Sequence, residues 1–156
     1  MAETRISLPF GDGDYEFRLG LRQLNEVQTA CGGDGIGEVF ARILAGRYMT
    51  GAGIEFGNPL EAKYRIEDLI AVLHQGLIGG GKGVVHGEPV EVDTTRAKQL
   101  IDRYALAEGV TLQSLWQLAA SVAYVAKEGY DPPGEAEPPQ EAADEPATDG
   151  STTDKP

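Results

Sequence analysis

The sequence predicts an α+β fold, in which an N-terminal β-hairpin is followed by a bundle of about five short helices and a disordered acidic C-terminal tail. Three observations predict this order. Apolar and polar residues alternate in residues 5–19, apolar residues recur at helical spacing in five later segments, and residues 131–156 contain no aromatic side chain. Strands and helices do not alternate along the chain, as they would in a doubly wound nucleotide-binding fold.

The predicted hairpin occupies residues 5–19. Two short runs place an apolar residue at every second position: Ile6, Leu8 and Phe10, then Tyr15, Phe17 and Leu19. The Gly-Asp-Gly-Asp segment 11–14 separates them, and Asp-Gly between alternating runs is a strong hairpin signal. Because Pro9 has no amide hydrogen to donate, we expect its strand at the edge of a sheet.

Helical spacing predicts the rest of the body. The five segments are 21–31, 36–46, 66–78, a fourth from about residue 94 to Gly109, and a fifth from about residue 112 to Gly129. Asp34 and Thr111 are placed to cap the second and fifth helices, and Asp93 or Thr94 begins the fourth. We predict loops for the glycine-interrupted segment 47–63 and for the segment through Gly83, Gly87 and Pro89.

Charge divides the chain into two predicted regions, an α+β domain in residues 1–130 and a tail in residues 131–156. The whole chain has a formal net charge of −12 and a pI of about 4.5, which argues against a nucleic-acid partner. The tail contains eight acidic residues against Lys155 alone and six of the nine prolines. It cannot bury enough apolar surface to offset chain entropy, so we predict that it is disordered.

Few residues are arranged for chemistry. His74 and His86 are the only histidines, Glu88 is the only carboxylate close to them in sequence, and the single Cys31 cannot form an internal disulfide. The sequence therefore predicts no metal, no cofactor and no catalytic site. The N-terminus is not followed by an apolar stretch, and no apolar run approaches the roughly 20 residues of a membrane span, so we expect neither a signal peptide nor a membrane segment.

The segment from Gly76 to Lys82 admits two interpretations. Its glycine and lysine spacing resembles a phosphate-binding loop, which would make the protein a nucleotide-binding enzyme. Such a loop follows a strand and has Ser or Thr after the lysine, whereas here a helical pattern precedes the segment and Gly83 follows it. We favour the end of an amphipathic helix, with Gly79 as its left-handed cap residue.

Three stretches resemble a known family of small phage proteins. They are residues 10–19 (FGDGDYEFRL), 21–28 (LRQLNEVQ) and 66–81 (IEDLIAVLHQGLIGGG). Together they resemble the small tail proteins of gene transfer agents and related long-tailed phages and prophages, which are grouped with tail assembly chaperones. The resemblance extends over roughly residues 5–128. The loop from Arg47 to Tyr64 and the acidic tail are longer than is typical of the family.

The resemblance implies a binding function without catalysis. Tail assembly chaperones bind the tape-measure protein and keep it soluble in the host cytoplasm until the tail tube forms around it. A structural tail-tube subunit, or contact with the tube protein, is the alternative, and self-association is left open. Tube subunits are β-rich, so a chain with about two strands and five helices favours the chaperone.

We expect the partner to contact apolar and glycine-rich positions on two helices. The residues are Gly76, Leu77, Ile78, Gly79, Gly80, Gly81, Leu118 and Val125. Three consecutive glycines exceed what a helix end requires, so a partner's backbone is expected to approach them closely if Gly80 is exposed. Leu118 and Val125 flank the main apolar face of the fifth helix, which is either central in the fold or covered by a partner.

Overall fold

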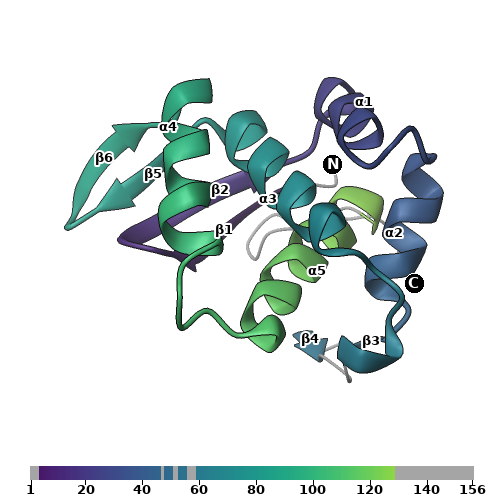
Figure 1. The fold of residues 1–156 in the computed structure, drawn as a ribbon. Coiled ribbons are helices and arrows are strands. Elements are labelled where there is room, and N and C mark those ends of the chain that lie inside the picture. Colours follow the sequence, from purple (N-terminus) through teal and green to yellow (C-terminus); the bar gives the residue numbers. More distant parts are fainter. Residues whose placement is uncertain (1–3, 47, 51–52, 56–58, 129–156) are drawn as a thin grey trace, which may run out of the picture. The chain divides into compact units, whose positions relative to one another are not determined.

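The computed structural model describes residues 4–46, 48–50, 53–55 and 59–128. Every element in it belongs to one unit, Thr4–Gly129, while the tail predicted for residues 131–156 lies outside the described residues. The fold is α+β, as the sequence predicts, with a four-stranded antiparallel sheet and five α-helices in the described part of the chain (Figure 1).

The sheet joins two hairpins that are distant in sequence. Its strand order is β1-β2-β5-β6, with β1 at Arg5–Phe10, β2 at Gly13–Arg18, β5 at Lys82–Val85 and β6 at Glu88–Glu91. Ile6 pairs with Phe17 and Leu8 with Tyr15, so the apolar residues of β1 and β2 share one face. The edge position predicted for the strand that contains Pro9 is confirmed.

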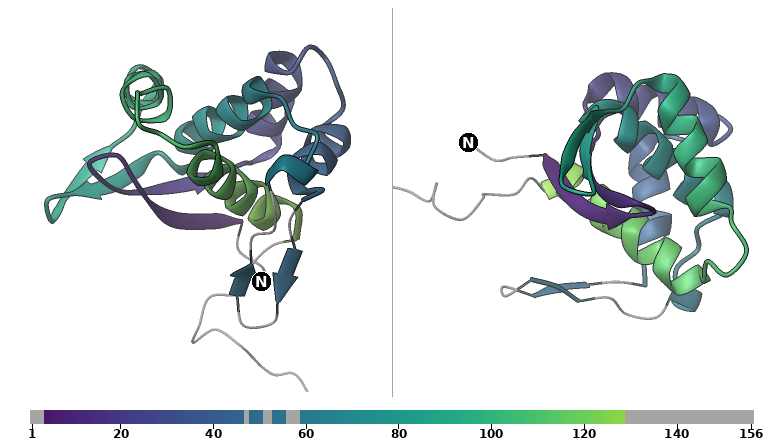
Figure 2. Two further views of the ribbon diagram at one scale, coloured as in Figure 1. Left: turned by 60° about the horizontal axis from the view of Figure 1, so that its bottom comes forward. Right: turned by 90° about the vertical axis from the view of Figure 1, so that its left-hand side faces the viewer.

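The helices lie to one side of the β1–β2 hairpin, and the third and fifth helices make the main contacts with it (Figure 2). Their bounds are α1 Leu21–Ala30, α2 Ile36–Leu44, α3 Ile66–Gly80, α4 Thr94–Leu100 and α5 Leu112–Glu128. The short 3-10 turn η1 (Pro59–Glu61) precedes α3, and the π-helical turn η2 (Ile101–Ala105) continues α4. Helix α3 is central, because it contacts β2, α1, α4 and α5.

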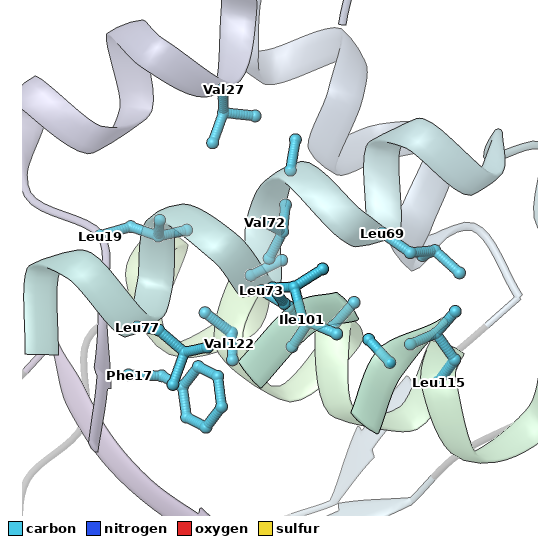
Figure 3. Packing of buried hydrophobic residues seen from close by; sticks show 14 of the residues in the cluster. Phe17, Leu19, Val27, Leu69, Val72, Leu73, Leu77, Ile101, Leu115 and Val122 are labelled. Atoms are coloured by element: carbon cyan, nitrogen blue, oxygen red, sulfur yellow. The ribbon is translucent and has the colours of Figure 1, made fainter. Parts of the chain in front are cut away.

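Leucines at helical spacing on α3 form the middle of the core. Leu69, Leu73 and Leu77 are fully buried, and Figure 3 shows Leu77 together with Phe17 of β2 and Val122 of α5. Trp116 of α5 is also fully buried, and its indole nitrogen donates a 2.7 Å hydrogen bond to the carbonyl oxygen of Ile43 in α2. This bond fixes α5 against α2 and satisfies the one polar atom of the indole ring.

Two predicted loops contain strands instead. The segment 82–91 forms the β5–β6 hairpin around His86 and Gly87, which both have positive φ angles of 53° and 80°. These angles suit a two-residue hairpin turn that follows the right-handed twist of the strands. Residues 48–50 and 53–55 form a second, two-stranded antiparallel pair, β3 (Tyr48–Thr50) and β4 (Gly53–Glu55).

The predicted helix caps are right at two of four positions. Asp93 caps α4 by accepting a 2.8 Å hydrogen bond from the amide of Arg96, and Thr111 accepts one from the amide of Ser114 at the start of α5. The cap predicted at Asp34 is wrong, because Gly35 is the N-cap of α2 and makes no side-chain bond. The cap predicted at Gly79 is also wrong, because α3 continues to Gly80 and the left-handed residue is Gly81, with φ 74°.

Candidate protein-binding surface

Two apolar grooves adjoin at Ile66, the first residue of α3. The α1–α3 groove has a volume of about 410 Å³ and is lined by Ala30, Ile66, Glu67, Ile70, Ala71 and His74. The η2–α5 groove has a volume of about 310 Å³ and runs along the connection between η2 and α5. It is lined by Ile66, Ala105, Leu106, Ala107, Val110, Thr111, Leu112 and Leu115. Ile66 is the one residue that lines both grooves, so they adjoin at its side chain.

Large apolar side chains are unusually exposed around the η2–α5 groove. Ile66 is 49% exposed, Leu106 57%, Val110 37% and Leu112 39%. Single exposed apolar residues are common on protein surfaces, but a group of them around one groove is typical of a binding site. The remaining exposed large apolar residues of the described part, Leu21, Leu60 and Val84, line neither groove.

His74 supplies one polar group to the α1–α3 groove. Its Nε2 atom is buried and has no hydrogen-bond partner among the described residues. Burial lowers the pKa of the imidazole, and Lys98 lowers it further, against an opposing effect of Asp102. His74 is therefore a neutral ring at pH 7.

A buried ion network fixes the start of α3 and hence the position of Ile66. Asp68 is fully buried and accepts two hydrogen bonds from the guanidinium of Arg42, at 2.9 and 2.8 Å. It also accepts a hydrogen bond from the backbone amide of Arg65 at 2.9 Å. Asp34, expected as a helix cap, instead forms ion pairs with Arg42 at 3.0 Å and Arg65 at 2.9 Å. The network joins the α1–α2 connection, α2 and α3.

Cys31 lies against the same network and is poorly placed for nucleophilic chemistry. The residue is 2% exposed, and burial together with the neighbouring Asp68 raises the pKa of its thiol to about 11. The reactive thiolate is therefore scarce at neutral pH. Within the described residues, no three side chains of the His, Cys, Asp and Glu types come together as metal ligands would.

The predicted glycine surface is largely internal. Gly76, Leu77 and Gly80 are buried, while Ile78 and Gly79 are half-buried. A Cβ atom on Gly79 would lie 1.9 Å from the carbonyl oxygen of Arg18, and one on Gly80 would lie 1.9 Å from that of Glu16. The close backbone approach expected of a partner is thus made by strand β2 of the same chain, and the expectation that Gly80 is exposed is wrong.

The two predicted residues of α5 lie in different environments. Val125 is only 3% exposed and packs inside the molecule, which makes it a poor contact for a partner. Leu118 is half-buried and lines a third groove of about 350 Å³ between β1 and α5, together with Leu8, Pro9, Ser114, Gln117 and Ser121. Of the eight predicted contact residues, Leu118 is the one that lines a described groove.

The segment that resembles a phosphate-binding loop is helical. Gly76–Gly80 form the last turn of α3, and Lys82 is the first residue of β5. Backbone amides inside a helix bond to the preceding turn, so they are not directed at a common point as a phosphate loop requires. Lys82 instead approaches Glu16, with its Nζ atom 3.9 Å from a carboxylate oxygen.

Comparison with protein-family models, with curated proteins and with solved structures gives no match to this chain. Among the described residues, no helix combines the length and the apolar character needed to cross a membrane. The assignment of function therefore depends on the surface of the molecule and on the resemblance in its sequence.

Proposed function

We propose that this chain is a tail assembly chaperone of a phage, prophage or gene transfer agent. It binds the tape-measure protein in the cytoplasm of the bacterial host and keeps it soluble until tail assembly. The observation that carries this proposal is the group of exposed apolar residues at Ile66, Leu106, Val110 and Leu112 around two adjoining grooves. The resemblance of residues 10–28 and 66–81 to small tail proteins supplies the identity of the partner.

The free energy gained by covering these side chains is small compared with the cost of association, and this comparison favours an extended partner. Covering a half-exposed leucine or isoleucine contributes on the order of 1 kcal/mol. Association costs at least about 4 kcal/mol in lost translational and rotational freedom. Four such side chains therefore do no more than offset the cost of association, and a stable complex requires a partner that also fills the α1–α3 groove. A long helix with an apolar stripe can contact both grooves, as a tape-measure segment would.

The double substitution Ile66→Glu with Leu106→Glu is expected to abolish chaperone function and to leave the fold intact. Both side chains are exposed, and a negative charge in the first turn of a helix is favourable, so the melting temperature should change by less than about 3 °C. When the chain is co-expressed with a tape-measure fragment, we expect the soluble fraction of the fragment to fall at least about fivefold relative to wild type.

A matched control carries the same added charge elsewhere. Leu21→Glu with Val84→Glu alters two exposed side chains, 84% and 45% accessible, that line neither groove. This variant should keep the fragment as soluble as the wild type does. The proposal is wrong if the fragment precipitates equally with and without the wild-type chain. The location of the site is wrong if the groove variant and the control behave alike.

A structural tail subunit is the second candidate, and the observation in its favour is the pair of outer strands in the sheet. β1 and β6 each lie at an edge of the four-stranded sheet and could pair with another copy. Each contains a proline, Pro9 or Pro89, which removes one amide donor and disfavours strand addition. Rings or tubes seen by electron microscopy of concentrated protein would favour this candidate over the chaperone.

A further inference from the structure

A small polar pocket lies between the β1–β2 turn and the helical segment formed by α4 and η2. It has a volume of about 80 Å³ and is lined by Asp12, Arg96, Gln99, Leu100 and Arg103. The pocket has room for several water molecules. A small oxyanion, such as a carboxylate or a single phosphate group, fits a pocket of this size.

The two arginines of the pocket differ in environment: Arg96 is half-buried and interacts with the hydroxyl of Tyr15, whereas Arg103 is exposed. Neither Arg96 nor Arg103 forms an ion pair with the described residues, whereas Arg42 and Arg65 of the α3 network both do. The Nε atom of the half-buried Arg96 is buried and has no hydrogen-bond partner in the described part of the chain. A buried donor without an acceptor is costly and calls for a ligand or a water. Guanidinium groups fit oxyanions in particular, because their donors are planar and paired.

The walls of the pocket are held in place without a ligand. The ring of Tyr104 in η2 packs over Gly11, where even a Cβ atom would come within 2.3 Å of it, and meets Phe10 edge to face at 6.2 Å. Asp12 accepts a hydrogen bond from the hydroxyl of Tyr15. These contacts fix the β1–β2 turn against η2, so a ligand does not have to order the site before it binds.

Asp12 restricts the kind of oxyanion that fits. Its carboxylate accepts hydrogen bonds and repels a bare anion, whereas a P–OH group donates a hydrogen bond to it. We propose that the pocket binds a protonated phosphate group, either inorganic phosphate or the end of a phosphomonoester. Arg96 and Arg103 donate to the charged oxygens, and Asp12 accepts the proton of the P–OH group. The net charge of −12 does not prevent this, because charges beyond about 8 Å are largely screened at physiological ionic strength.

The test is an NMR titration of the full chain at pH 6, where phosphate and about half of a phosphomonoester carry the required proton. Inorganic phosphate, glycerol phosphate and sulfate are the three probes. We expect phosphate to shift the Arg96 Nε–H resonance and the amides of Gly11 and Asp12 with saturation in the millimolar range. Sulfate, which has no proton at this pH, should bind at least about tenfold more weakly. Saturation by glycerol phosphate shows that the pocket accepts an ester, and saturation by inorganic phosphate alone shows that it accepts only the free ion.

Substitutions distinguish phosphate binding at this pocket from nonspecific attraction of phosphate to basic residues. Arg96→Gln and Arg103→Gln should each weaken phosphate binding about tenfold, and Asp12→Asn should narrow the preference for phosphate over sulfate. Arg22→Gln removes an exposed arginine of α1 that lies outside the pocket and should change nothing. The proposal is overturned if phosphate shifts none of the pocket resonances, if sulfate binds as well as phosphate, or if Arg22→Gln weakens binding as much as the pocket variants do.

Discussion

Gly80→Val is expected to destabilise the protein by about 3 kcal/mol or more, close to the upper limit for overpacking in a core. The new Cβ atom would lie 1.9 Å from the carbonyl oxygen of Glu16 and 2.4 Å from its carbonyl carbon. These are backbone atoms of β2, so no side chain can rotate to make room. Helix α3 would have to move away from the sheet, and the packing of Leu77 against Phe17 would be lost with it.

Gly37→Ala is the matched control for this prediction. Gly37 also lies inside a helix, α2, but a Cβ atom there meets nothing within 4 Å. Alanine is preferred over glycine in a helix by about 0.5–1 kcal/mol, so this variant should be slightly more stable than wild type. Urea unfolding, monitored by circular dichroism, measures the free energy of unfolding of the Gly80→Val and Gly37→Ala variants. A Gly80→Val protein as stable as wild type would mean that α3 does not approach β2 this closely.

The glycine run shows where the sequence is informative and where it is not. Three consecutive glycines at the end of an apolar helix indicate a close backbone approach, and the structure contains one at Gly79 and Gly80. The sequence around the glycines does not identify the segment that approaches them. It is β2, which lies some 60 residues earlier in the chain, and only the packing of the whole fold reveals that the site is internal rather than open to a partner.

Periodicity predicted the first hairpin and all five helices because each buries one regular face. The β5–β6 hairpin was missed because Gly83 and Pro89 interrupt its short strands, and both residues are typical of loops. Its strand character depends on β2, which pairs Asp14 with Val84 and Tyr15 with Gly83. At Gly83 the absence of a side chain is required, since a Cβ atom would lie 2.5 Å from the ring of Tyr15. The valines on both sides of His86-Gly87 are the signal that could have indicated this hairpin.

The two candidate binding regions could not be predicted for a related reason. Ile66, Leu106 and Val110 are ordinary apolar residues within their own segments, and they meet only because α3 begins beside the η2–α5 connection. Arg96 and Asp12 likewise come together only when the β1–β2 turn packs on η2. Sequence patterns report which face of an element is buried. They do not report which exposed residues from separate elements become neighbours.

Asp68→Asn is expected to cost about 3 kcal/mol of stability at pH 7. The substitution removes the buried one of the two carboxylates that pair with Arg42, whose side chain is only 17% exposed, and leaves Asp34 as its remaining partner. Breaking a buried ion pair costs about 3–5 kcal/mol. The partial exposure of Arg42 places the effect at the lower end of that range. Asp102→Asn is the matched control, because Asp102 pairs with Lys98 in a largely exposed i,i+4 pair. Its loss should cost no more than about 0.5 kcal/mol.

The pH dependence of the stability difference between wild type and Asp68→Asn tests whether the buried charge causes that difference. Burial alone would raise the pKa of the Asp68 carboxyl, but the hydrogen bonds from Arg42 and from the Arg65 amide outweigh burial and hold the pKa below its ordinary value. A carboxyl whose pKa is depressed by folding stabilises the protein above the unfolded value of about 3.9, and this contribution is lost as the pH falls through the folded value. The stability gap between wild type and Asp68→Asn, measured by urea unfolding, should therefore be constant from pH 7 to about pH 5 and shrink below about pH 4. A gap that stays constant down to pH 3 would mean that shape and hydrogen bonding at Asp68, and not its charge, hold the start of α3 in place.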